Sequence, residues 1–232
     1  MGRFLCFLFC VTLRLMVSAE LGKVGVCIVG TEPQQMMRCM ESAYEYLSPR
    51  ESIHYFIFIP AQHIPNKVYE DEYVSMIPAE SGFTVDWFLP LYTPVILSCY
   101  AALFADYDTL VVIDSNCLFV QDVSLENLQP SFTVARERDT QLPYSYMFWG
   151  GPKAYILDIC QWVANEIYQN LSHRALASQN FANKVFNEYW QKHPPQQILP
   201  HTFMVCHRKR YLLWEQSPQE NTDVHIIDRG AL

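Results

Sequence analysis

Residues 107–116 read YDTLVVIDSN, an apolar run that stops abruptly at Asp114, Ser115 and Asn116. The Thr, Val and Ile content of residues 109–113 predicts a strand buried on both faces of a parallel sheet. In an open sheet of this kind, ligands bind beyond the carboxyl ends of the strands. The three polar residues therefore mark either a metal and phosphate site or an ordinary turn, which the same residue types favour.

The segments around this run alternate between strand and helix patterns. Residues 23–32 and 52–60 are β-branched and apolar, whereas residues 34–47 carry one apolar helical stripe. A β-α-β order implies a parallel pair of strands with a crossover. Further helices are expected from Val95 and over 153–171 and 178–192, with an extended connector at 194–200. Shorter strands are expected at 73–77, 117–122, 131–137, 144–151, 210–214 and 223–228.

Composition and motifs exclude several classes of protein. The chain has 232 residues, half of them apolar, which suits one sizeable domain with a packed core. A formal net charge of −8 argues against a nucleic-acid phosphate backbone as the main partner. The patterns GxGxxG, GxxxxGK[ST], HExxH and GxSxG do not occur, which disfavours dinucleotide oxidoreductases, P-loop enzymes, zincins and serine hydrolases.

The first 20 residues predict a targeting segment. Arg3 precedes an apolar run over residues 4–13, and VSA resembles a signal-peptidase site before Glu20. A cleaved signal peptide, a short uncleaved anchor and a buried first strand are the three interpretations, in that order of preference. The sequon that begins at Asn170 and the eight cysteines fit a secretory route, in the Golgi or ER lumen or outside the cell. We therefore expect one domain over 21–232, with membrane contact confined to the N-terminal segment.

Three other motifs could belong to a site or to plain structure. FWGG at 148–151 allows close backbone approach and offers aromatic faces to a sugar ring, but it also suits a strand-to-helix turn. Ser178 and Gln179 open a helix, where Ser178 by itself is a cap. The basic run at 207–210 could meet phosphates or remain a solvated surface. Cysteines in apolar segments are expected to be buried free thiols, and the lack of a CxxC pattern leaves a zinc knuckle or thioredoxin motif unsupported.

Taken in order, five segments resemble the ABO-type retaining glycosyltransferases, the family of the blood-group A and B transferases and the α-1,3-galactosyltransferases. The segments are VGVCIVGTE, ESAYEYLSPRESIHYFIFIPAQHIP, YDTLVVIDSNCLFVQDVSLENLQP, FWGGPKAYILDICQWVANEIY and QNFANKVF with HPPQQILP. The resemblance implies a GT-A nucleotide-diphospho-sugar transferase fold, a Rossmann-like mixed sheet flanked by helices. It also implies a UDP-sugar donor, usually with Mn²⁺, and a glycan acceptor on a glycolipid or glycoprotein.

The resemblance assigns roles to individual positions. It implies that Val29, Gly30 and Thr31 contact the uridine. Asp114, Ser115 and Asn116 would face the rest of the nucleotide sugar, with Asp114 and Asn116 as metal ligands. Gln179 would occupy the catalytic position beneath the anomeric carbon. The acceptor side would comprise Trp149, Gly150, Gly151 and Ser178.

The sequence also departs from the family pattern. Asn116 replaces the second aspartate of the metal motif, and Gln179 replaces the catalytic glutamate. A neutral amide weakens metal binding, so Mn²⁺ is expected to bind weakly or not at all. Three hypotheses remain. The chain transfers a hexose of the galactose or N-acetylgalactosamine class with retention, it binds glycans or nucleotide sugars without catalysis, or it is an unrelated secreted α/β domain.

Overall fold

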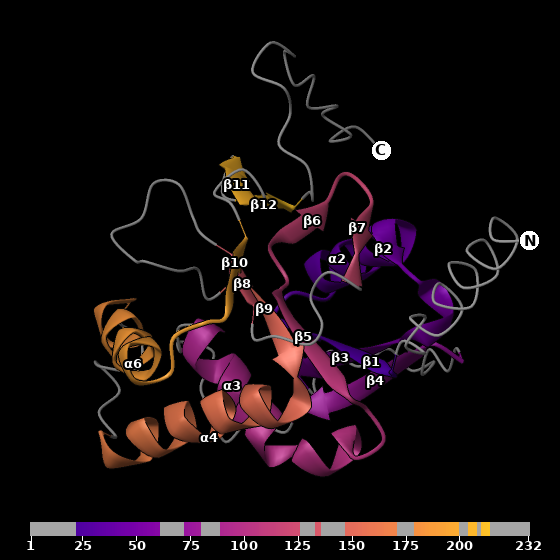
Figure 1. The fold of residues 1–232 in the computed structure, drawn as a ribbon. Helices are drawn as coiled ribbons and strands as arrows, with labels where there is room; N and C mark the ends of the chain where they lie inside the picture. Colours follow the sequence, from indigo (N-terminus) through magenta and orange to yellow (C-terminus); the bar gives the residue numbers. More distant parts are fainter. Residues whose placement is uncertain are drawn as a thin grey trace, which may run out of the picture.

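The computed structural model describes residues 22–60, 72–79, 89–125, 133–135, 147–170, 179–199, 204–207 and 210–213. The expected leader at 1–20 and the expected strand at 223–228 lie outside these ranges. Within them, the chain alternates between strands and helices, as Figure 1 shows. The predicted α/β class is confirmed.

A mixed seven-stranded sheet forms the centre of the structure. Its strand order is β10-β8-β9-β5-β1-β3-β4. Strand β1 pairs in parallel with both β3 and β5, whereas β9 runs antiparallel to β5 and β8. The seven strands are β1 (Val24–Val29), β3 (Ile53–Pro60), β4 (Val74–Ala79), β5 (Thr109–Asp114), β8 (Thr133–Ala135), β9 (Phe148–Pro152) and β10 (Gln197–Leu199).

Two small sheets flank the central one. A three-stranded sheet has the order β11-β12-β6, and β2 pairs with β7. Their strands are β2 (Leu47–Ser48), β6 (Cys117–Phe119), β7 (Val123–Ser124), β11 (Met204–His207) and β12 (Arg210–Leu213). Strand β6 starts directly after Asn116, so the three-stranded sheet lies at the edge where β5 ends (Figure 1).

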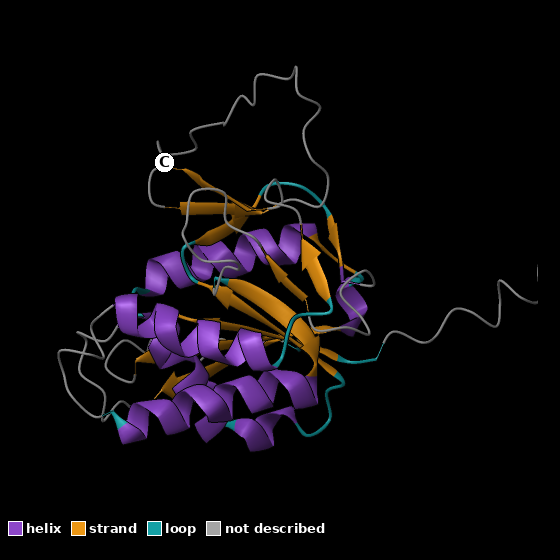
Figure 2. Cartoon of the chain, turned by 60° about the vertical axis from the view of Figure 1, so that its left-hand side comes forward, coloured by secondary structure: helices purple, strands orange, loops and turns teal. Residues whose placement is uncertain are grey.

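Helices cover both faces of the central sheet, and each face has its own hydrophobic core (Figure 2). Helix α2 (Pro33–Tyr46) covers one face, where it packs on side chains such as Val26 and Ile28. Helices α3 (Leu89–Cys99), α4 (Lys153–Gln169) and α6 (Gln179–Lys192) belong to the opposite face. The 3₁₀ turns η1 (Arg50–Ser52) and η3 (Ala101–Phe104) connect elements. In the described part of the chain, no helix is long and apolar enough to cross a membrane.

Two expectations from the sequence are corrected by the fold. Helix α3 begins at Leu89 rather than at Val95 and carries Pro94 inside it. An interior proline costs a helical hydrogen bond, and this cost is offset by the burial of the residues around it, Leu91–Leu97. The segment expected to be only an extended connector contains β10, which pairs in parallel with β8.

The direction of β9 brings the end of β8 and the start of β9 to the same edge of the sheet. Strand β8 ends at Ala135, and β9 begins at Phe148, which pairs with Ile113. Because β8 runs antiparallel to β9, its last residue lies at the edge where β9 starts. The N–H of Asp114 donates to the carbonyl of Met147 at 2.9 Å, so this edge also carries the end of β5.

Candidate functional site

The candidate site lies at the carboxyl ends of β1 and β5. These parallel neighbours end in register, with Val29 opposite Asp114. From β1 the chain proceeds to β3 and β4 on one side, and it later returns to place β5 on the other side. Such a reversal of strand order leaves a crevice beyond the strand ends, which is where open α/β sheets bind ligands.

The carboxylate of Asp114 is held by the turn that follows it. Its Oδ1 atom accepts hydrogen bonds from the backbone N–H and the side-chain Nδ2 of Asn116, both at 2.8 Å. Only 7% of Asp114 is exposed, and Ser115 is buried beside it. This Asx-type turn orients the carboxylate and the Asn116 amide toward each other.

Burial raises the pKa of the Asp114 carboxyl above its usual 3.8, because the charged form loses solvation. The two hydrogen bonds from Asn116 act in the opposite direction, since they stabilise the charged form. Burial is the larger effect. An ionised carboxylate at this position therefore costs folding free energy, which is a common property of functional groups in clefts.

Gly30 packs directly against the turn after β5. A Cβ atom built at Gly30 would lie 2.7 Å from Ser115 Oγ and 2.6 Å from Met36 Cγ. Separations this short do not occur between real side chains, so only glycine fits without movement of its neighbours. The end of β1 and the turn after β5 are thus in van der Waals contact.

An open depression adjoins the Asp114–Asn116 turn and has space for about one water molecule. Its walls come from α2 and from the β5–β6 connection. The lining residues are Gln35, Arg38, Ser115, Asn116 and Leu118. Gln35 and Arg38 were not among the predicted site residues. Their signal in the sequence is their spacing of three on the helix after β1, which places both side chains on one face.

The residues at the turn fit a divalent metal poorly. Within the described ranges, no three His, Cys, Asp or Glu side chains gather closely enough to share an ion. Asp114 Oδ1 is already occupied by two N–H donors of Asn116. Mg²⁺ and similar hard cations prefer carboxylate oxygens, and Asn116 supplies a neutral amide instead.

The three predicted uridine contacts differ in accessibility. Val29 and Gly30 are buried, and the Val29 side chain belongs to the core between the sheet and α3. The Thr31 side chain is exposed immediately beyond them. Of the three, Thr31 is therefore the one whose side chain is free to meet a base.

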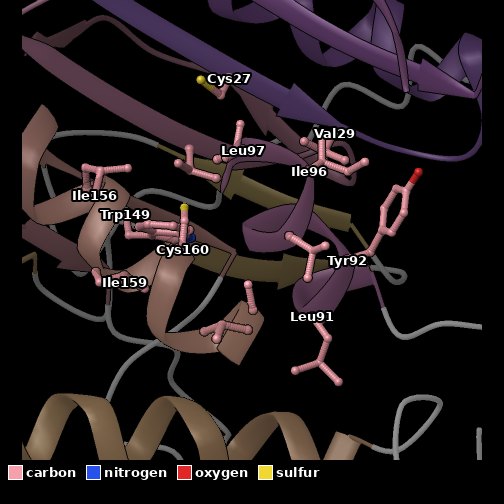
Figure 3. Packing of buried hydrophobic residues seen from close by; sticks show 14 of the residues in the cluster. Cys27, Val29, Leu91, Tyr92, Ile96, Leu97, Trp149, Ile156, Ile159 and Cys160 are labelled. Atoms are coloured by element: carbon pink, nitrogen blue, oxygen red, sulfur yellow. The ribbon is translucent and has the colours of Figure 1, made fainter. Parts of the chain in front are cut away.

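The predicted acceptor residues on β9 lie inside the sheet. Trp149 is 2% exposed and packs against Ile156, Ile159 and Cys160 of α4, as Figure 3 shows. Gly150 pairs with Val111, three positions before Asp114, or about 10 Å along the strand. The ring of Trp149 packs in the core, and of the FWGG motif only Phe148, which pairs with Ile113, adjoins the Asp114 turn.

Different structural features explain why glycine occupies positions 150 and 151. A Cβ atom at Gly150 would lie 3.2 Å from the carbonyl oxygen of Leu110, a close approach between neighbouring strands. Gly151 has φ 151°, a backbone conformation that other residues rarely adopt. Gly151 therefore owes its residue type to its backbone conformation, and a larger residue at Gly150 would require the neighbouring strand to shift by a few tenths of an ångström.

Gln179 is the first residue of α6, whose apolar side packs with α4 in the core beneath the sheet. Only the backbone of Gln179 is described, and Ser178 lies outside the described residues. Whether Gln179 reaches the Asp114 turn stays a prediction.

The described cysteines are free thiols. Cys27, Cys39, Cys117 and Cys160 are buried, and Cys99 is exposed. Burial raises the pKa of Cys27, Cys39 and Cys160. The expectation of buried free thiols is confirmed at these four positions.

Comparison with known proteins gives no match, either to the family models or among the curated sequences.

Proposed function

We propose that this chain is a retaining glycosyltransferase with a GT-A fold. It would move a hexose of the galactose or N-acetylgalactosamine class from a UDP-sugar to a glycan hydroxyl. The observation that carries the proposal is the register of Val29 with Asp114 at the point where the strand order reverses. The resemblance to ABO-type transferases supplies the donor class and the reaction.

The proposed donor lies across the ends of β1 and β5. Thr31 would face the uridine, and the Asp114–Asn116 turn would lie beside the diphosphate. Gln179 would lie beneath the anomeric carbon, where its neutral amide can orient the sugar but cannot act as an anionic nucleophile. A front-face route suits these residues. The bond from C1 to the phosphate oxygen breaks, the acceptor oxygen bonds to C1, and the acceptor proton passes to the leaving phosphate.

The proposed setting is the lumen of the secretory pathway. Residues 1–20 would direct or anchor the chain there, and the acceptor would be a glycan on a glycolipid or glycoprotein. The sequon at Asn170 supports this setting.

A second candidate function is binding without catalysis. It is favoured by the Asp114–Asn116 pair, because Asn116 is neutral and occupies Asp114 Oδ1. A protein that has kept the donor cleft without its charge would bind a nucleotide sugar or glycan and release it unchanged.

One experiment separates the two functions. The purified protein is incubated with UDP-galactose or UDP-N-acetylgalactosamine and a panel of glycans, with and without Mn²⁺. We expect a product whose anomeric configuration, read by NMR, equals that of the donor. Donor binding in calorimetry with neither transfer nor hydrolysis would select the second function. The absence of both binding and transfer would refute both.

A further inference from the structure

We propose that Arg38 binds the diphosphate of the nucleotide donor and supplies the positive charge that a divalent metal would otherwise provide. The inference rests on the proposed function, because it names the group that recognises the donor at the same site. It concerns the depression lined by Gln35, Arg38, Ser115, Asn116 and Leu118.

The packing of α2 on β6 aims Arg38 at this depression. Ser42 Oγ donates to the Cys39 carbonyl at 2.8 Å and accepts the Phe119 N–H at 3.1 Å, which fixes the helix against the strand. Arg38 precedes Ser42 by four residues and follows Gln35 by three, so the three side chains share one helix face. This face lies against β6 and the residues before it. Ser42 contacts Phe119 there, and Gln35 and Arg38 line the depression together with Asn116 and Leu118.

The Arg38 guanidinium has no competing partner in the described part of the chain. The residue is exposed, and the one ion pair among the described residues joins Lys184 to Glu188. An arginine with no ion-pair partner among the described residues, beside a polar turn, stands out in a chain with a net charge of −8. The planar guanidinium of Arg38 can donate hydrogen bonds to two phosphate oxygens at once. A carboxylate partner would otherwise occupy these donors.

The start of α2 is a poorer place for an anion than Arg38. Pro33 lacks the N–H that a helix N-terminus normally offers, and Glu32 places an exposed acid at the cap. The attraction that helix dipoles exert on phosphates is therefore weakened at the first turn. Arg38 lies in the second turn of the helix, and its side chain offers N–H donors, together with the side-chain amide of Gln35, beside the buried Ser115.

The side chains at the Asp114–Asn116 turn favour recognition of the diphosphate by an arginine rather than by a metal ion. Asp114 has one oxygen tied to Asn116, and the neighbouring positions are neutral. These side chains would bind a hard cation weakly, because they offer few carboxylate oxygens. The guanidinium of Arg38 belongs to the protein itself and needs no such ligands. The expected result is donor binding that does not depend on Mn²⁺.

Calorimetry with UDP, uridine and inorganic pyrophosphate tests the inference, in buffer that contains EDTA and again with Mn²⁺. We expect UDP to bind in EDTA, and Arg38→Gln to weaken UDP and pyrophosphate at least about tenfold. The affinity for uridine should not change, and Arg38→Lys should retain part of the UDP affinity. Lys23→Gln is the matched control, because it removes one exposed positive charge at the opposite end of β1.

The outcomes separate this inference from the proposed function. If UDP binds equally well to the wild type and to Arg38→Gln, or binds only with Mn²⁺, the inference is wrong while the proposed function stands. If pyrophosphate binds through Arg38 but no nucleotide does, the anion site is supported and the proposed donor is wrong. If neither UDP nor pyrophosphate binds, both proposals are refuted.

Discussion

Asp114 and Asn116 form a closed pair in which two N–H groups of the asparagine, each at 2.8 Å, bind one oxygen of the buried aspartate. The pair combines a carboxylate whose pKa is raised by burial with an amide that partly compensates for that burial. The folding free energy lost by burying the charge of Asp114 and the affinity of this turn for ligands can therefore be measured in the same set of variants.

Asp114→Asn should stabilise the fold and, in the absence of metal, strengthen UDP binding, because it removes a negative charge beside the proposed diphosphate site. The new amide oxygen still accepts both N–H groups of Asn116, while the buried charge disappears. We expect the free energy of unfolding at pH 7 to rise by about 1 kcal/mol, or about 2–4 °C in Tm. Calorimetric melting and UDP titration would measure the two effects.

The pH dependence checks the cause of this stabilisation. Because the folded pKa of Asp114 lies above its unfolded value, the wild type loses stability as pH rises through the folded pKa. The difference between Asp114→Asn and the wild type should therefore shrink toward pH 4 and be full at pH 7. A difference that is constant over this range would show that charge burial is not its cause.

Asn116→Asp should create a metal site and destabilise the apo protein. Two neighbouring carboxylates repel each other, so we expect a loss of about 1–2 kcal/mol at neutral pH without metal. Mn²⁺ should restore stability to this variant by binding between the carboxylates, with little effect on the wild type. Melting curves with and without Mn²⁺ measure the difference, and an equal response of both proteins would contradict the prediction.

Gly30→Ala should destabilise the fold by about 1–3 kcal/mol, because its methyl group overlaps Ser115 and Met36. Combining it with Ser115→Gly should recover about 1 kcal/mol relative to the sum of the single changes. Gly25→Ala is the control, since its Cβ would meet Leu110 and Phe56 instead and should add independently to Ser115→Gly. Additivity in both pairs would rule out the contact between the strand ends.

His54 should make stability fall on acidification. Its Nε2 lies 2.8 Å from Ser75 Oγ, and burial lowers its pKa below 6.5 against the smaller effect of the Glu72 carbonyl. The unfolded chain therefore takes up the proton first, and stability declines as pH falls below about 6.5. Denaturant unfolding of the wild type and of His54→Gln should show a difference that narrows toward acid pH. A pH-independent difference would argue against it.

Cys99 should react with iodoacetamide in the native protein far faster than the four buried thiols. It is exposed, whereas Cys27, Cys39, Cys117 and Cys160 are enclosed in the core, and thiolate formation is disfavoured at three of them. Peptide mapping by mass spectrometry after a short pulse gives the rate for each residue. Labelling in denaturant is the control, in which all five should react alike.

The central strands could be predicted from the sequence because their pattern is local. Strands β1, β3 and β5 are continuous apolar runs, and the first two are separated by the amphipathic α2. This arrangement predicts parallel pairing and places Asp114 at a ligand-binding edge. Helices α4 and α6 were likewise marked by their apolar stripes.

The remaining features depend on contacts that the local pattern does not show. Trp149 was predicted to contact the acceptor, but the antiparallel pairing of β9 with β5 turns its ring into the core under α4. Arg38 is an exposed helical residue, and only the docking of α2 on β6 gives it a position at the turn. The early start of α3 follows from tertiary burial, which overrides the preference of its prolines.

The meeting of the ends of β8 and β9 at the Asp114 edge makes this fold adaptable. The connection between Ala135 and Met147 is anchored at both ends by paired strands, so its length can change without shifting the register of the sheet. A change in the number of residues between these two strands would therefore leave the pairing of β9 with β5 and β8 intact, and with it the position of Asp114.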